Sequence, residues 1–310
     1  MASPSDASHA VTISRRVLVT GLDGFTGHYV AAELRAAGHE VCGLSSGVAA
    51  AGAGTHGAVD LLDATAVKDA VARLRPQAVV HLAAIAFVAH GDVDAIYRTN
   101  ILGTRHLLAA LAELPEPPAR VILASSANVY GNAPGSAGAL DESTPLAPAN
   151  DYAVSKLAME YMARTWRPRL PLVLARPFNY TGVGQSTSFL IPKIVDHFRR
   201  GARQIELGNL DVWREFMDVR TVAWTYRRLL ETDSEGDTFN ICSGRSHSLR
   251  EVLAMMEQVA GYAIEVRVNP AFVRANEVVR LEGDPRRLHA RVGKPPAHEL
   301  RQTLRWMYEA

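Results

Sequence analysis

The sequence predicts an α/β fold, a doubly wound parallel sheet followed by a smaller, discontinuous α/β domain. Short apolar, β-rich segments alternate with helical patterns through residue 178, which is the order of βαβ units. A glycine-rich turn separates the first strand from the first helix, and from residue 179 the segments become shorter and less regular. We therefore expect one domain over 11–178, completed by about 218–243, and a second over 179–217 and 244–310.

Composition bounds the class of protein. The 310 residues are 48% hydrophobic and 21% charged, as in a soluble globular protein, and a net charge of +1 argues against a nucleic-acid-binding surface. Cys42 and Cys242 have neither pairing nor metal-ligand spacing, and the eleven histidines form no HExxH cluster. We therefore expect no metal and a reducing compartment. No apolar run suits a membrane span or a signal core, so we expect a cytoplasmic location and no membrane partner.

The glycine-rich turn carries the first functional signal. Residues 16–20, RVLVT, are expected to form the first strand, and GLDGFTG follows directly. Gly21 would permit the tight turn, Gly24 would let the backbone approach a pyrophosphate, and Gly27 would let the helix pack closely on the strand. Alone this spacing is a weak signal, but at the first strand–helix junction it favours a dinucleotide-binding Rossmann domain.

The end of the second strand bears on cofactor choice. The helix after the glycine turn would offer the amides of Phe25 and Thr26 to the phosphates. The second strand, expected over 40–46, ends in Ser45 and Ser46. This strand end contains no carboxylate that would repel a 2′-phosphate and no arginine that would bind one. We expect NADPH, with NADH left open.

The third strand is expected over 58–63, AVDLLD. Asp60 and Leu61 would lie beside the adenine of the cofactor, although Asp60 is equally suited to a loop or a cap. Asp63 is expected to be the N-cap of the next helix, because a short acidic side chain there accepts from free amides.

The fourth strand is expected within 77–86, QAVVHLAAIA, a nearly continuous apolar run typical of a strand buried on both faces. His81 is expected to be a satisfied core or strand-end residue and not a ligand. Open α/β sheets bind ligands at the carboxyl ends of their strands. Leu82, Ala83 and Ala84 are therefore expected to contact the cofactor.

The segment 151–161, DYAVSKLAMEY, has the composition of a helix. Tyr152 and Lys156 would lie on one face, one turn apart. A phenol has an ordinary pKa of about 10, and a nearby ammonium is expected to lower it, so that the pair exchanges protons near neutral pH. Taken alone, an ordinary helix with an exposed Tyr and Lys is the more common explanation.

The remaining elements follow the same patterns. A helix over about 92–114 should stop at the following prolines, and RVILASSANVYG should be a fifth strand that ends in serines. A sixth strand should break at Asn179. Beyond it we expect a Pro-initiated helix at 189–201, a Gly-Asn turn between short strands at 204–218, a helix at 219–231, a strand at 238–244 that rejoins the sheet, and two further helices flanking a strand at 263–268.

GLDGFTG, SSANVYG and YAVSK, in this order, resemble the extended short-chain dehydrogenase/reductase family, also called the NAD-dependent epimerase/dehydratase family. The resemblance covers nearly the whole chain. It implies a catalytic group of Ser126, Tyr152 and Lys156, with Lys156 also holding the nicotinamide ribose. Ser126 is preferred to Ser125 because it directly precedes ANVYG. The resemblance also implies a homodimer, formed through the two helices at about 92–114 and 151–166.

Three later segments narrow the resemblance. ARPFNYTGVGQ, GNLDVWREFMDV and RANEVVRLEGDP are similar to segments of enzymes that act on GDP-mannose derivatives. A diphosphate needs cations, and a carboxylate accepts hydrogen bonds from ribose hydroxyls. A surface salt bridge is the usual alternative for each arginine. The implied substrate contacts, with Asn128 beside the catalytic serine, are Asn179, Lys193, Arg214, Arg274 and Glu277.

Asn128 distinguishes between reactions. Dehydratases of the family carry a carboxylate two residues after the catalytic Ser or Thr, whereas an asparagine takes up no proton. The resemblance therefore implies NAD(P)H-dependent reduction of the 4-keto group of a GDP-4-keto-6-deoxy-hexose, with the rhamno and talo products both open. The alternatives are a nucleotide-sugar epimerase or 4,6-dehydratase, and a non-catalytic NADP-sensing protein.

Overall fold

The computed structural model describes residues 14–45, 55–86, 91–132, 138–234, 236–272 and 278–310. At its centre is a parallel sheet of seven strands in the order β11-β6-β5-β4-β1-β2-β3. The predicted α/β class with a doubly wound parallel sheet is confirmed. The strands are β1 (Arg16–Thr20), β2 (Glu40–Ser45), β3 (Thr55–Ala58), β4 (Ala78–His81), β5 (Val121–Ala124), β6 (Leu172–Pro177) and β11 (Thr238–Ile241).

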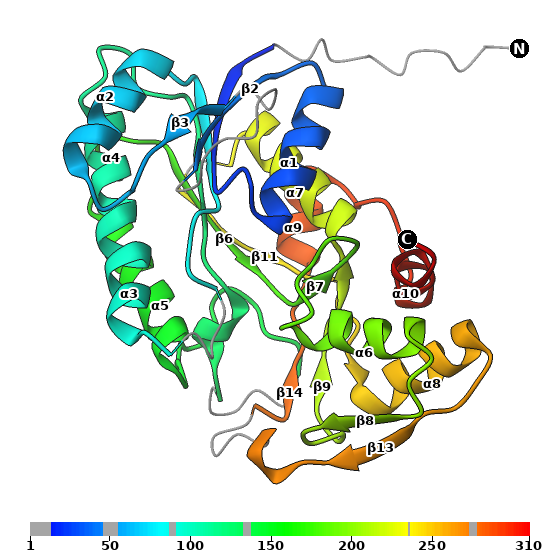
Figure 1. Ribbon diagram of the computed structural model, residues 1–310. Coiled ribbons are helices and arrows are strands. Elements are labelled where there is room, and N and C mark those ends of the chain that lie inside the picture. The colour runs from blue at the N-terminus through cyan, green and yellow to red at the C-terminus, as the bar shows by residue number, and fades with distance from the viewer. Residues whose placement is uncertain (1–13, 46–54, 87–90, 133–137, 235, 273–277) are drawn as a thin grey trace, which may run out of the picture.

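Helices cover both faces of this sheet (Figure 1). Alternate residues of a strand pack into two separate hydrophobic cores. Val17 and Val19 belong to one core, and Leu18 belongs to the other. This two-sided burial explains the continuous apolar runs of the strands. One face carries α1 (Phe25–Ala36), α7 (Val219–Glu231) and α9 (Arg286–Val292), and the other carries α2 (Ala64–Leu74), α4 (Thr104–Ala112) and α5 (Asp151–Arg164).

Several predicted boundaries were wrong. The third strand lies at Thr55–Ala58 and not at 58–63, and Asp60 is in the turn that follows, where its carboxylate accepts from the Leu62 amide at 2.9 Å. The fourth strand ends at His81. Asp63 is confirmed as the N-cap of α2, because its carboxylate accepts from the Ala66 amide at 3.0 Å.

The helix expected over 92–114 is divided into three pieces. α3 (Val93–Tyr97) leads into a π-helical segment, η1 (Arg98–Gly103), and then into α4. Asn100 in η1 is fully buried; its side-chain amide donates to the Ser155 hydroxyl on α5 at 2.9 Å. The π-helical segment thus brings a polar side chain against the predicted Tyr–Lys helix.

The smaller part of the molecule lies beyond the carboxyl ends of the large sheet (Figure 1). Its core contains Ile194, Leu207, Val252 and Leu304. The capping box of α8, in which Ser248 and Glu251 satisfy each other's backbone amides, fixes the start of that helix. Its elements are α6 (Leu190–Arg199), β8 (Gln204–Leu207), β9 (Trp213–Arg214), β12 (His247–Ser248), α8 (Leu249–Ala260), β13 (Glu265–Val268), β14 (Arg280–Leu281) and α10 (Leu300–Glu309).

The strands of this part pair over long range. β8 and β9 flank the predicted Gly-Asn turn but do not pair with each other: β8 pairs with β13, and β9 lies between β12 and β14. Among the described residues after 244 there are three α-helices, not two. One of them, α9, returns to the large sheet, where Leu288 and Val292 join the core. None of the described helices is long and apolar enough to span a membrane.

Candidate active site

The glycine turn has the geometry that its sequence predicts. Gly21 has φ +70°, and a Cβ there would lie 2.9 Å from the Ala83 amide nitrogen. A Cβ at Gly27 would lie 2.1 Å from the Gly21 carbonyl oxygen. Gly24 is the N-cap of α1 and supplies no side-chain hydrogen bond to the first turn, where Phe25 and Thr26 stand. A helix N-terminus without a capping side chain suits a phosphate, so the turn fits a dinucleotide.

A buried network fixes the neighbouring end of β4. The Thr104 hydroxyl donates to the Asn100 carbonyl at 2.8 Å and lies 2.8 Å from His81 Nε2. It therefore accepts from Nε2–H, which leaves His81 Nδ1 as an acceptor for the Thr20 hydroxyl at 2.7 Å. The Thr20 oxygen in turn accepts from the Ala83 amide at 3.2 Å. Burial lowers the pKa of His81 to about 3, so His81 is the satisfied core residue that the sequence predicts.

Leu82, Ala83 and Ala84 continue from this strand end and are half-buried. The Leu82 amide donates to the Thr20 carbonyl at 3.2 Å, which holds the segment against the glycine turn. Because Gly21 nearly touches Ala83, the two predicted parts of a cofactor site adjoin. Their contact with a cofactor stays a prediction.

The predicted adenosine end is less clearly built. Ser45 is buried at the end of β2, Asp60 is exposed, and Leu61 is buried. The Leu61 carbonyl accepts from His106 Nδ1 at 2.9 Å. Ser46 lies outside the described residues. The roles proposed for these four residues stay predictions.

Ser126, Tyr152 and Lys156 meet at the carboxyl end of β5. Asn150 caps α5 by accepting from the Ala153 amide at 2.9 Å, which places Tyr152 in the first helical turn. The Ser126 side chain lies close enough to the Tyr152 hydroxyl to affect its pKa, and Lys156 Nζ donates to the Ala124 carbonyl at 2.7 Å. Exposed fractions are 8% for Ser126 and Tyr152 and 4% for Lys156, so the exposed Tyr–Lys helix that the composition also allowed is excluded.

The geometry also separates the two adjacent serines. The Ser125 hydroxyl is buried and donates to Glu160 Oε1 at 2.6 Å, away from Tyr152. The Ser126 oxygen accepts from the Asn128 amide at 3.1 Å and also meets the Tyr152 hydroxyl. Ser126 is therefore the serine in position to share a ligand atom with Tyr152.

The electrostatics of the pair differ from the expectation. Burial raises the pKa of Tyr152 to about 12; the Ser126 hydrogen bond opposes this shift, and nearby Tyr180 adds to it. Burial lowers the pKa of Lys156 to about 8, against the opposing effect of Glu160. The expectation that Lys156 brings the Tyr152 pKa down toward neutrality was wrong, because burial is the largest influence on this pKa and raises it.

Sequence reasoning missed a contact across the site. The Tyr180 hydroxyl, on β7 (Tyr180–Thr181), lies 2.7 Å from the Thr26 hydroxyl on α1. The Tyr180 ring also stacks on Phe25, with centroids 6.2 Å apart. These residues are 154 positions apart in the chain, and no local pattern signals such a contact.

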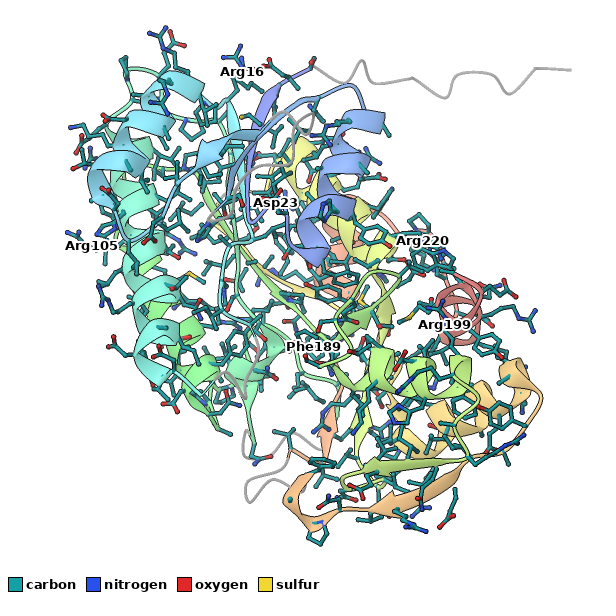
Figure 2. All side chains as sticks on the ribbon, viewed as in Figure 1. Arg16, Asp23, Arg105, Phe189, Arg199 and Arg220 are labelled. Carbon is teal, nitrogen blue, oxygen red and sulfur yellow. The ribbon has the colours of Figure 1, made fainter. Side chains whose placement is uncertain are left out.

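Two of the predicted substrate residues, Lys193 and Arg214, lie in the smaller part. Lys193 Nζ donates to the Glu206 carbonyl at 2.8 Å and lies 4.6 Å from the centre of the Phe272 ring. Arg214 Nη1 donates to the carbonyls of Trp213 at 2.8 Å and Val279 at 3.3 Å. In Figure 2, Phe189, just before α6, lies where the large sheet and the smaller part meet.

Arg274 and Glu277 lie outside the described residues. Lys193 contacts Phe272 on one side of this segment, and Arg214 contacts Val279 on the other. Asn179 accepts from the Met217 amide through its backbone carbonyl at 2.9 Å, and Asn128 stands in η2 (Ala127–Tyr130), a short 3₁₀ helix after Ser126. Within the described part of the chain, no group of three His, Cys, Asp or Glu side chains could hold a metal ion.

Comparison with known proteins identifies the class. Residues 17–242 match the model of the NAD dependent epimerase/dehydratase family. The chain is 32% identical over 276 residues to GDP-6-deoxy-D-talose 4-dehydrogenase of Aggregatibacter actinomycetemcomitans, covering 88% of this chain and 90% of the relative. It is 34% identical over 302 residues to GDP-6-deoxy-D-mannose reductase of Pseudomonas aeruginosa, covering 94% and 96%.

Two solved structures are similar over nearly their whole length. RMD from Pseudomonas aeruginosa, complexed with NADPH, has a TM-score of 0.85 and 33% identity, covering 96% of this chain and 98% of that one. A crystal structure from Burkholderia cenocepacia J2315, described as that of a provisionally assigned epimerase, has a TM-score of 0.89 and 54% identity, covering 96% and 97%.

Proposed function

Because the chain belongs to the NAD dependent epimerase/dehydratase family, we propose that it reduces the 4-keto group of a GDP-4-keto-6-deoxy-hexose with NADPH. One observation carries the proposal: Ser126, Tyr152 and Lys156 lie together at the carboxyl end of β5, while the position of the dehydratase carboxylate holds Asn128. The site therefore has the groups that hydride transfer needs and lacks the base that elimination needs.

In this mechanism, NADPH supplies the hydride to carbon 4 of the sugar. Tyr152 donates its proton to the ketone oxygen, and Ser126 donates a hydrogen bond to the same oxygen. The raised pKa of Tyr152, about 12, keeps the phenol protonated until hydride addition at carbon 4 places negative charge on the ketone oxygen. The ammonium of Lys156 stabilises the phenolate that Tyr152 leaves behind and holds the hydroxyls of the nicotinamide ribose.

The substrate side supplies cations for the diphosphate. We assign this role to Lys193, Arg214 and Arg274, with Asn179 near the sugar and Glu277 on the nucleotide ribose. The names of the two curated relatives support a GDP-linked 6-deoxy-hexose. Talose and mannose differ in configuration at carbon 4, so these names leave the rhamno and talo products as the two candidates.

The decisive experiment supplies purified protein with 4-keto nucleotide sugars and NADPH or NADH. We expect one equivalent of NADPH to be oxidised per GDP-4-keto-6-deoxymannose consumed, with the product configuration read by NMR. If the protein oxidises neither NADPH nor NADH with any of these 4-keto nucleotide sugars, the reductase assignment is rejected.

A second candidate is a nucleotide-sugar epimerase, which the description of the 54% identical structure favours. An epimerase retains and recycles its cofactor, so product would form without net oxidation of added NADPH. The same assay therefore separates the two activities, because it compares moles of product with moles of NADPH consumed.

The choice of nucleotide can be tested apart from turnover. We propose that free GDP binds more tightly than UDP or dTDP, and calorimetry with the three nucleotides measures this directly. Equal or tighter binding of UDP or dTDP would remove the GDP-sugar assignment and leave the reductase standing.

We also propose a cytoplasmic homodimer. α5 packs beside α4 and η1, and the exposed apolar side chains of these helices include Leu102, Val154 and Tyr161. Arg105 projects outward from the same layer (Figure 2). A two-fold pair of such helix layers would bury these side chains. Both cysteines are free and buried, which suits a reducing compartment. Sedimentation of only monomer at micromolar concentration would reject the dimer.

A further inference from the structure

A buried ion pair lies beneath the candidate active site. Glu160 and Arg176 have exposed side-chain fractions of 0% and 2%. Arg176 donates from Nε to Oε1 of Glu160 at 2.8 Å and from Nη2 to Oε2 at 2.7 Å. A buried pair repays its desolvation only with good geometry, and its net contribution to stability is small. Stability is therefore a weak reason for these two charges, and their position suggests another.

Glu160 holds the segment just before Ser126. Its Oε1 accepts from the Ser125 hydroxyl at 2.6 Å. One turn earlier on α5, Lys156 donates to the carbonyl of Ala124. The Ser125 amide also donates to the Ala175 carbonyl on β6 at 2.7 Å. The end of β5 is thus tied to the helix that carries Tyr152 and to the next strand.

Arg176 holds the segment just after Ser126. Its Nη1 donates to the Tyr130 hydroxyl at 3.0 Å. That hydroxyl donates to Asn240 Oδ1 on β11 at 2.7 Å, and Asn240 Nδ2 donates to the Leu140 carbonyl at 2.9 Å. Tyr130 is the last residue of η2, which begins directly after Ser126. The ion pair therefore fixes the chain on both sides of Ser126.

We propose that Glu160 is a positioning residue for the reaction: through Ser125 on one side and through Arg176 and Tyr130 on the other, it holds Ser126 against Tyr152. Glu160 touches neither substrate nor cofactor in this assignment, and the inference rests on the roles proposed above for Ser126 and Tyr152. Hydrogen bonds on both sides of Ser126 limit the movement of its hydroxyl, which must lie within hydrogen-bond distance of the reacting oxygen.

The charge of Glu160 has a second effect on the site. The titratable groups near Lys156 include Glu160 and Tyr152 on its own helix and neutral His81 from β4. Arg176 from β6 and Arg164 from α5 face Glu160 in turn. Glu160 supports the charged form of Lys156. Its neutralisation would lower the pKa of Lys156 further and move the alkaline limit of activity to lower pH.

The test compares three variants in kinetics and pH dependence. For Glu160→Gln we expect kcat about tenfold lower, the effect of one weakened buried hydrogen bond. We expect an unchanged KM for NADPH and an alkaline limb of kcat/KM displaced to lower pH. Ser125→Ala removes the hydrogen bond from Ser125 to Glu160 and keeps both charges of the ion pair. We therefore expect kcat to fall roughly fivefold and the alkaline limb of kcat/KM to stay at the same pH. The matched control is Glu231→Gln, which removes the carboxylate that pairs with Arg227 on α7. It should change neither kcat nor the alkaline limb of kcat/KM.

Two further measurements keep the proposal falsifiable. If Glu160→Gln does not fold, the double variant Glu160→Gln/Arg176→Gln removes both charges. A positioning role predicts low kcat in that folded protein, whereas wild-type kcat would overturn it. A crystal structure of the folded variant needs no substrate: we expect Ser126 Oγ to be displaced from the Tyr152 oxygen, compared with a crystal structure of the wild-type protein. An unmoved Ser126 rejects the inference alone, whereas the absence of NADPH and NADH oxidation by the wild-type protein rejects the proposed function.

Discussion

The two regions that face each other across the candidate site are built in different ways. At the carboxyl end of the large sheet, Ser126, Tyr152 and Lys156 are buried, and the side chains of Ser126 and Lys156 are hydrogen-bonded to the backbone. On the smaller part, Arg214 lies on a strand of two residues, and Lys193 is held by a carbonyl and a ring.

The contrast follows from the chemistry that each region is proposed to perform. Proton transfer needs fixed donors in a water-poor site, where preorganised groups act most strongly. Binding of a diphosphate needs cations that reach several oxygens, and the long half-buried side chains of Lys193 on α6 and Arg214 on β9 provide them. We therefore expect substitutions in the first region to lower turnover and substitutions in the second to weaken nucleotide binding.

Tyr152→Phe should have the largest effect. It removes the proposed proton donor and retains the buried ring, so kcat should fall by about 100- to 10,000-fold, with NADPH affinity nearly unchanged. Tyr161→Phe is the matched control, because Tyr161 is on the same helix but 58% exposed. Near wild-type turnover in Tyr152→Phe would show that another group supplies the proton.

Arg214→Ala, in the smaller part, should weaken nucleotide binding. Loss of hydrogen bonds to a charged phosphate costs about 1.5–3 kcal/mol, so the Kd for GDP should rise roughly 10- to 150-fold. NADPH affinity should not change, because the glycine turn lies on the large sheet. Arg267→Ala is the control, since Arg267 makes an exposed ion pair with Glu265 in the same part of the molecule. Loss of NADPH binding in Arg214→Ala would mean that the two sites are misassigned.

The pH dependence of reduction should show the titration of Lys156. Its pKa is lowered to about 8, so Lys156 is charged below that pH and neutral above it, whereas Tyr152, with a pKa of about 12, stays protonated. Since the proposed mechanism needs the ammonium, kcat/KM should fall above pH 8 by about tenfold per pH unit. A profile from pH 6 to 10 that stays level or rises would contradict this assignment.

The smallest effect on turnover should come from the proposed dimer face. Leu102→Glu combined with Val154→Glu places charges on exposed apolar positions of η1 and α5 and should convert a dimer to monomers in sedimentation. Since the three candidate catalytic residues come from one chain, kcat should change only slightly. Val268→Glu is the control on β13, where Val268 is 56% exposed. An unchanged dimer in the double variant would place the interface elsewhere.

Local sequence patterns predicted the parts of the fold that depend on neighbours in the chain. The first strand, the glycine turn and the following helix were predicted from residues 16–38, and α7 begins and ends where its pattern predicts. Glycine geometry, helix capping and apolar periodicity act over a few residues. For the same reason, the four-residue spacing of Tyr152 and Lys156 was enough to place both on one face of α5.

The tertiary structure decided everything that depends on distant segments. The pairing of β8 with β13 instead of β9 and the contact of Thr26 with Tyr180 join residues far apart in the chain, which no local pattern describes. The pKa of Tyr152 is the clearest case. The sequence places an ammonium one turn away, but the fold buries the phenol, and the desolvation of its charged form is a sum over every neighbour that packs around it.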